Sequence, residues 1–243
     1  MRGSFLRQII ILFFLIGILA SASSFAVEIP SSTRSKKAIA EASQRIFPEL
    51  ENQGLLLGMP VYIRIFKESS ELELWVEKND IFKLFKTYPI CYYSGDLGPK
   101  LREGDNQSPE GFYFVTPRQL NPYSTFYLSF NIGYPNVYDR SQGRTGSAIM
   151  VHGDCVSIGC YAMTDEQIEE IYTIIDAALR NGQPFFRVHI FPFRMTEENM
   201  ARHEESKWFS FWQNLKKGYD FFSESKRPPN VVVLNGNYSF EAI

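Results

Sequence analysis

An imidazole and a thiol lie eight positions apart in the run HGDCVSIGC, which extends from His152 to Cys160. A thiol attacks a carbonyl as its thiolate, and a neighbouring imidazole can remove the thiol proton and later protonate a leaving amine. Gly153 and Gly159 permit a tight turn that brings the two side chains together and leaves backbone amides near Cys160 free to stabilise an oxyanion. The run therefore predicts a nucleophilic cysteine, Cys160, with His152 as its base.

Two other interpretations of the same run stay open on the local residues alone. His152, Asp154, Cys155 and Cys160 could form a zinc set, although a structural zinc usually needs four ligands with paired cysteine spacing, and no such pair exists here. Alternatively, Cys155 and Cys160 form a disulfide and His152 is a hydrogen-bonded histidine at a strand end. We expect neither a metal nor a cofactor.

The elements that must position this run can be recognised by their periodicity. Alternating apolar residues predict a β-hairpin over 61–66 and 71–77, and the run from Ile81 to Tyr93 is expected to continue its sheet. Thr164-Asp165-Glu166-Gln167 matches a capping box, and an apolar stripe at helical spacing follows until Asn181-Gly182 ends the helix. Further strands are expected over 111–115, 126–132, 148–151 and 185–191.

The two ends of the chain are expected to be helical or irregular. A short helix over 36–47 is predicted to end at Pro48, because proline interrupts a helix interior. Near the other end, the pattern predicts short helices over 196–203 and 207–215. The second carries an aromatic cluster, which indicates packing on a core rather than a surface that stacks on sugars. Residues 226–243 are expected to form an edge strand or a loose tail.

Residues 1–26 have the three-part layout of a secretory signal peptide: Arg2 and Arg7, an apolar run of about a dozen residues, and small residues up to Ala26. The apolar run is shorter than the roughly 20 residues of a spanning helix, so we expect cleavage after Ala26, with an uncleaved anchor as the alternative.

Cleavage removes two of 25 basic residues, and 23 against 27 acidic residues gives a net charge of minus 4. This balance argues against a nucleic-acid partner.

Three cysteines are an odd number for a chain bound for an oxidising compartment, so one of them lacks an intramolecular partner. A reactive Cys160 must be the free one. Cys91 and Cys155 are then either bridged or both buried as thiols, and we expect buried thiols.

The run resembles the hallmark of the YkuD-type L,D-transpeptidase catalytic domain, in which a strand ending in His-Gly precedes a Ser-x-Gly-Cys turn. Here these are His152-Gly153 and the turn from Ser157 to Cys160. A second family feature upstream is matched by Gly104 and by Ser108-Pro109-Glu110-Gly111 with the aromatic Phe112. The stretches ICYYSGDLGPK, SPEGFY and HGDCVSIGCYAM look like the YafK-like subfamily.

The resemblance implies a β-rich α+β fold: a β-sandwich with a capping helix after the nucleophile and C-terminal helices. The resemblance covers a catalytic domain at 59–193; the residue patterns add a signal peptide at 1–26, a linker and short helix at 27–58, and a helical extension and tail at 194–243. Cys160 would attack the carbonyl of the third residue of a peptidoglycan stem peptide and form a thioester. Such a reaction would contribute to cell-wall synthesis or degradation and to cell shape, and it would take place in the periplasm. The implied site also includes Ser157, Gly159 and Tyr161 at the turn or oxyanion, and Arg144, Gly153 and Ser108 near the substrate; Arg102 and Arg140 are further loop cations that could bind stem carboxylates.

The sequence departs from the common family pattern in three ways. Ile158 replaces a second histidine, Tyr161-Ala162 follows Cys160 where an apolar residue and a cation or amide are common, and the interval from His152 to Cys160 is short. A short interval leaves the site more open to water or to a bulky acceptor. Hydrolysis that releases an outer-membrane lipoprotein from the wall is therefore an alternative to transfer, and a non-catalytic module that binds wall peptides is a third.

Overall fold

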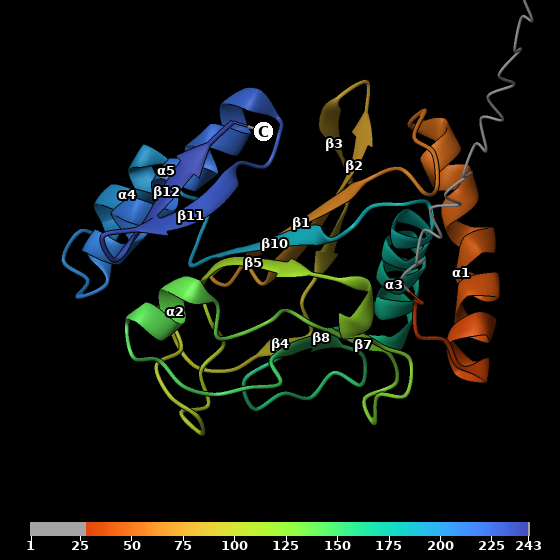
Figure 1. Ribbon diagram of the computed structural model, residues 1–243, viewed down its shortest axis with the longest axis horizontal. Helices are drawn as coiled ribbons and strands as arrows, with labels where there is room; N and C mark the ends of the chain where they lie inside the picture. The colour runs from red at the N-terminus through yellow and green to blue at the C-terminus, as the bar shows by residue number, and fades with distance from the viewer. Residues whose placement is uncertain (1–27, 243) are drawn as a thin grey trace, which may run out of the picture.

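The structure, a computed structural model, describes residues 28–242, and Figure 1 shows how its elements are arranged. The predicted signal peptide lies outside this range. No helix within 28–242 is both long enough and apolar enough to span a membrane. The helices are α1 Thr33–Asn52, α2 Val137–Ser141, α3 Asp165–Arg180, α4 Glu197–Arg202 and α5 Phe209–Ser225, with a 3-10 turn at Pro117–Gln119.

Two five-stranded sheets form the centre of the molecule. The first has the order β3-β2-β1-β10-β5, and the second has the order β4-β9-β8-β7-β6. The first comprises β1 Val61–Phe66, β2 Glu71–Lys78, β3 Ile81–Pro89, β5 Gly111–Val115 and β10 Phe186–Phe191; the second comprises β4 Tyr92–Tyr93, β6 Leu120–Asn121, β7 Ser129–Asn131, β8 Met150–His152 and β9 Tyr161–Ala162. The mixed α+β fold expected from the resemblance is confirmed.

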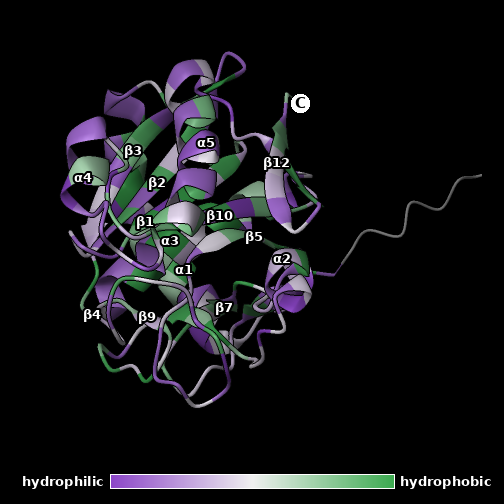
Figure 2. Cartoon of the chain, turned by 90° about the vertical axis from the view of Figure 1, so that its left-hand side faces the viewer, coloured by the Kyte–Doolittle hydropathy of each residue, from purple (hydrophilic) through white to green (hydrophobic). Residues whose placement is uncertain are grey.

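The main core lies between the sheets and α1 and α3. It collects the inward-facing side chains of β1, β10, β8 and β9 with the apolar stripe of α3. Figure 2 shows hydrophobic residues gathered in the central strands and hydrophilic residues over much of α4 and α5. A second cluster covers the opposite face of the first sheet, where Phe191 and Phe112 pack against Trp212 and Leu215 of α5.

The predicted capping box at the start of α3 is confirmed. The Thr164 side chain accepts from the N–H of Gln167, and the Gln167 side chain accepts from the N–H of Thr164. The hairpin of β1 and β2 is also confirmed, with Ile63 paired to Leu74. Both features depend on residues close in sequence, which is why the local pattern was sufficient.

The prediction that Pro48 ends the first helix is wrong, because α1 continues to Asn52. Proline removes one helical hydrogen bond, but Ile46 and Leu50 on either side of it are buried in the core. Arg45 on the same helix pairs with Glu169 of α3 at 2.7 Å. Packing against α3 therefore outweighs the local penalty, and α1 is a packed helix of 20 residues.

The expectation for the chain end is also wrong. Residues 226–242 do not add an edge strand to the main sheet. They form a two-stranded hairpin of their own, β11 Asn230–Leu234 and β12 Asn237–Glu241. The run from Ile81 to Tyr93 is likewise split, because β3 ends at Pro89 in the first sheet and β4 begins at Tyr92 in the second.

Candidate active site

The parallel pairing of β8 and β9 places Cys160 and His152 on one face of the second sheet. Val151 lies opposite Tyr161, and His152 lies opposite Ala162. Extended by one residue, this register puts Cys160 beside Met150, whose N–H lies 3.4 Å from the Cys160 Sγ. Side chains alternate along strands, so His152 and Cys160 share a face while the Val151 and Tyr161 side chains enter the core.

The His152 ring is held by its own neighbour. Its Nδ1 lies 2.6 Å from the carbonyl oxygen of Gly153. A carbonyl oxygen only accepts hydrogen bonds, so Nδ1 carries the proton and the lone pair lies on Nε2. The side chain is only 2 % exposed, and burial lowers the pKa of His152. The histidine is thus a neutral base with a fixed tautomer.

The Cys160 thiol is free and partly exposed. Its Sγ contacts the Met150 N–H and lies 3.8 Å from the carbonyl oxygen of Ala148. Burial raises the pKa of the Cys160 thiol, and the Met150 N–H and the Lys100 charge partly offset that effect. Within the described residues no hydrogen bond joins Cys160 to His152 directly. The two pKa shifts, lowered for His152 and raised for Cys160, both favour the neutral forms, and proton transfer between the groups needs a closer approach or a bridging water.

Ser157 fixes the turn that leads to the nucleophile. Its Oγ accepts from the N–H of Cys160 at 2.7 Å and from the N–H of Gly159 at 3.1 Å, and it donates to the Cys160 carbonyl at 2.9 Å. Gly159 has a φ of +148°, which a residue with a side chain rarely adopts. Both amides are engaged by Ser157, so the expectation that they stand free for an oxyanion is wrong for this structure.

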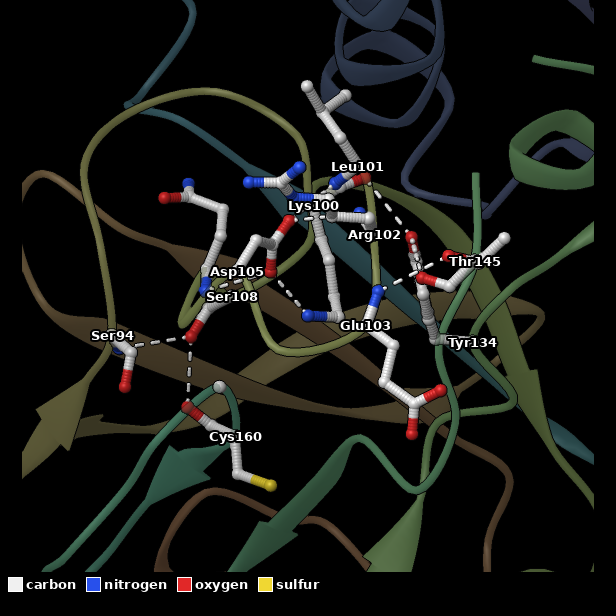
Figure 3. Close-up of polar contacts among 12 residues, drawn as sticks. Ser94, Lys100, Leu101, Arg102, Glu103, Asp105, Ser108, Tyr134, Thr145 and Cys160 are labelled. Atoms are coloured by element: carbon white, nitrogen blue, oxygen red, sulfur yellow. Dashed lines mark hydrogen bonds and ion pairs between the residues drawn. The ribbon is translucent and has the colours of Figure 1, made fainter. Parts of the chain in front are cut away.

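Ser108 supports the same backbone from a distant part of the chain. Its buried hydroxyl donates to the Cys160 carbonyl oxygen at 3.0 Å and accepts from the Ser94 N–H at 3.1 Å. Figure 3 shows Ser108 between Ser94 and Cys160. Ser108, which was expected near the substrate, thus contacts the backbone of Cys160.

A buried ion pair holds the loop that carries Ser108. The Lys67 Nζ donates to the Ser108 carbonyl at 3.1 Å and to Glu110 Oε1 at 3.2 Å, and both side chains are fully buried. Trp212 of α5 donates its indole N–H to Glu110 Oε2 at 2.8 Å. The C-terminal extension is therefore part of the scaffold on which the nucleophile turn rests.

Comparison with known proteins identifies the family to which the chain belongs. The family model for the YkuD L,D-transpeptidase catalytic domain matches residues 60–190. YafK from Escherichia coli K12, whose assignment as an L,D-transpeptidase is provisional, is 54 % identical over 183 residues, or 75 % of this chain and 74 % of YafK. The protein belongs to the L,D-transpeptidase catalytic domain family.

Solved structures are more distant. The helical cell shape determining protein Pgp2 from Campylobacter jejuni (K307A mutant) gives a TM-score of 0.44 at 19 % identity, over 79 % of this chain and 65 % of Pgp2. Bd1075 from Bdellovibrio bacteriovorus gives 0.40 at 19 % identity, over 73 % of this chain and 78 % of Bd1075. The predicted L,D-transpeptidase family is confirmed by the family model and by YafK.

The cysteine pairing differs from the expectation. Cys91 and Cys155 form a disulfide with a Cα–Cα distance of 5.3 Å, and both residues are exposed rather than buried thiols. The Cys91 N–H bonds to the Ala162 carbonyl, and the Cys155 N–H bonds to the Met163 carbonyl, so both approach the end of β9. This pairing contradicts a Cys155–Cys160 bridge.

The disulfide also removes Cys155 from the zinc interpretation, because its sulfur is no longer a thiolate. Within residues 28–242 no group of three or more His, Cys, Asp or Glu side chains is arranged to hold a metal.

The remaining expected site residues of this L,D-transpeptidase domain have mainly structural contacts. Tyr161 is buried and donates its hydroxyl to the Pro109 carbonyl at 2.7 Å. Arg144 is buried in a 2.8 Å ion pair with Asp139, so its guanidinium is already neutralised. A side chain at Gly153 would approach Asp165 Oδ1 to 2.5 Å, so this position needs glycine for packing.

The two other loop arginines, Arg102 and Arg140, lie on the surface as exposed side chains.

Three residues near Cys160 and His152 were not predicted from the sequence as part of the site. The Phe126 ring lies 4.8 Å from the His152 ring, centroid to centroid, at an interplanar angle of 33°. The Lys100 ammonium pairs with Asp105 and partly offsets the rise that burial causes in the pKa of Cys160. Ser94 donates its hydroxyl weakly to Ser157 at 3.5 Å. The aromatic at Phe126 lay inside a predicted strand, and only the fold brings it to the histidine.

Proposed function

We propose that the protein is an exported cysteine acyltransferase that acts on peptidoglycan stem peptides, with Cys160 as nucleophile and His152 as base. The observation that carries the proposal is the His152–Gly153 contact, which leaves Nε2 unprotonated on the face that also bears the Cys160 thiol. The family to which the chain belongs acts on peptidoglycan peptides. Neutral thiol and neutral imidazole are the starting state of general-base catalysis.

The reaction follows from these two groups. Nε2 of His152 takes the thiol proton as the Cys160 sulfur attacks the carbonyl of the third stem residue. The same nitrogen then protonates the departing amine of the terminal residue, and a thioester remains on Cys160. An acceptor amine attacks the thioester, His152 removes its proton, and the thiol is restored. One amide is exchanged for another, so no ATP is needed.

The oxyanion that forms during attack needs donors, and Ser157 already uses the amides of Gly159 and Cys160. We infer that Ser157 either gives up these amides during the reaction or positions Cys160 while other donors face the substrate. Lys100, whose charge partly offsets the burial-raised pKa of Cys160, favours negative charge at this place.

Hydrolysis is the second candidate, and the open form of the turn favours it. Ile158 is 85 % exposed and Val156 is 53 % exposed, so the residues between base and nucleophile form no cover over Cys160. Water could then resolve the thioester in place of an amine, and the protein would release a lipoprotein from the wall. A purely binding module would need Cys160 to be buried or oxidised, and this thiol is free and partly exposed.

Export to the periplasm is proposed on two grounds. Residues 1–26 have the layout of a signal peptide. The Cys91–Cys155 disulfide fits an oxidising compartment, where such bridges persist.

The test is incubation of purified protein with tetrapeptide-bearing and lipoprotein-linked wall fragments in ¹⁸O-labelled water, followed by mass analysis of the products. Transfer predicts cross-linked or lipoprotein-linked products without label. Hydrolysis predicts ¹⁸O in the new carboxylate of the released fragment. Cys160→Ala is the control and should give neither; product formation by that variant would refute the proposed site.

A further inference from the structure

A cavity of about 220 Å³ lies on the face of the first sheet that α5 and the β11–β12 hairpin cover. None of the residues of the nucleophile turn lines it. Its walls are mostly apolar and come from β5, from the start of α2, from the segment before β10, and from β11 and β12. The apolar side chains of these walls include Phe112, Phe114, Phe185, Val231 and Val233.

Two polar side chains of β10, Arg187 and His189, enter this apolar cavity. They are two residues apart on one strand, so they point to the same face. The residues between and beside them, Phe186, Val188 and Ile190, face the main core. The strand therefore places a guanidinium and an imidazole side by side against the cavity.

The tautomer of His189 follows from its one partner. Its Nδ1 lies 2.7 Å from the hydroxyl of Tyr62, which is fully buried and has no other hydrogen-bond partner among residues 28–242. A buried hydroxyl needs an acceptor for its proton, so Tyr62 donates to Nδ1 and the His189 proton lies on Nε2. Nε2 has no partner in the described structure. His189 is 1 % exposed and lines the cavity, so this N–H is a free donor at the cavity wall.

Arg187 is a cation without a counter-ion. Among the described residues it makes no ion pair and no side-chain hydrogen bond, and its guanidinium lies over the Phe185 ring at 5.0 Å. Burial lowers the pKa of Arg187. A half-buried charge without a partner is unfavourable, so an anion beside Arg187 would stabilise the protein.

We propose that this cavity binds an amino-acid-sized organic monocarboxylate with an aromatic or branched apolar body. The carboxylate pairs with the Arg187 guanidinium and accepts from the Nε2–H of His189. The apolar body fills the space between Phe112, Phe114 and the valines of β11. The volume lies below the range typical of drug-sized ligands, so it suits a single small molecule.

A neighbouring arginine provides a matched control. Arg227 lines the adjacent cavity, to which Arg187 also contributes, but it does not line this one. Replacing either arginine by glutamine removes one positive charge from the same side of the molecule. Only the change at Arg187 should alter binding if the carboxylate sits where proposed.

The experiment is an NMR titration of the purified protein with 3-phenylpropionate and with its neutral isostere, 3-phenylpropanamide. We expect saturable binding of the carboxylate with a Kd of about 1 mM or tighter, and binding of the amide weaker by about tenfold. Arg187→Gln should weaken carboxylate binding by about tenfold, and Val233→Trp, which fills the cavity, should abolish it. Arg227→Gln should bind like the unchanged protein.

Circular dichroism and thermal melts establish that each variant is folded, and Arg187→Lys, which keeps the charge, serves if Arg187→Gln does not fold. Lys should retain a weakened preference for the carboxylate over the amide. Three results would overturn the proposal: no saturable binding by the unchanged protein, equal binding of carboxylate and amide, or unchanged binding in folded Val233→Trp.

Discussion

The Nδ1 atom of His152 and the carbonyl oxygen of Gly153 lie 2.6 Å apart, so the residue after the base fixes its tautomer. Gly153 has no side chain, and one would collide with Asp165 and Ile168. The short stretch between β8 and α3 therefore orients the imidazole and packs the backbone at the same time. The mechanism proposed for Cys160 depends on this arrangement.

His152→Ala should lower kcat/KM by about three orders of magnitude, nearly as much as Cys160→Ala, because base and nucleophile act as one unit. The double variant should be no slower than the slower single variant. Steady-state rates on stem-peptide substrates test this, with circular dichroism to establish the fold. His203→Ala, which removes a part-buried imidazole that pairs with Glu68 and stacks on Phe193, is the control; it should lose some stability but keep its activity. A double variant much slower than both single ones would contradict the pairing.

The pH dependence of activity should have its acidic limb below the ordinary histidine value of 6.5, because burial lowers the pKa of His152. Protonated His152 cannot accept the thiol proton, so kcat/KM falls as pH falls through that lowered pKa. The pKa of Cys160 is raised above its ordinary 9.0, so alkylation by iodoacetamide should accelerate with pH between 7 and 9. A midpoint above 6.5, or alkylation independent of pH, would instead indicate a thiolate–imidazolium pair.

Gly159→Val should reduce activity by roughly one to two orders of magnitude, because φ is +148° there and a β-branched residue is strained by about 1–3 kcal/mol. The nearest atom to a new Cβ is 3.7 Å away, so backbone strain and not a clash is the cause. Gly182→Val, at another left-handed position with a φ of +103° and open space, is the matched control. It should lose stability in urea unfolding but keep its activity, and equal losses of activity in both variants would contradict a special role for the nucleophile turn.

One thiol per chain should react with an alkylating reagent before reduction, and peptide mapping should place it at Cys160. Two more should appear only after a reductant opens the Cys91–Cys155 bridge. Replacing both bridged cysteines by serine should lower the free energy of unfolding by about 2–4 kcal/mol, measured by urea denaturation. Rapid labelling of Cys91 or Cys155 without reductant would show that the nucleophile has been assigned to the wrong residue.

Local features of the fold could be predicted from the sequence. The capping box at Thr164 and the alternation in β1 and β2 depend on neighbours within a few residues. The last hairpin was also accessible, because Asn235-Gly236 between two β-forming runs is a strong hairpin signal. Interpretation as an edge strand or tail overlooked that signal. Pro48 in α1 could not be predicted locally, because packing against α3 decides it.

The site was predictable only in part. The motif singles out Cys160 and His152 as candidates, because both lie in one run of nine residues. The partners that hold them are distant: Ser108 reaches the Cys160 carbonyl across 52 positions, and Cys91 reaches Cys155 across 64. These contacts depend on the register of β4, β9 and β8, which no local pattern encodes. Arg144 is a loop cation near the motif, which is why the sequence suggested contact with substrate. In the fold its side chain is buried against Asp139.

The assignment of Cys160 as nucleophile is tested by intact-protein mass spectrometry of the protein mixed with a tetrapeptide stem and quenched in acid. We expect a mass increase equal to the acyl tripeptide portion, located on Cys160 by peptide mapping and released by neutral hydroxylamine as a thioester would be. Cys160→Ala should show no such adduct, and His152→Ala should form it far more slowly. An adduct on another residue, or full product formation by Cys160→Ala, would show that Cys160 is not the nucleophile.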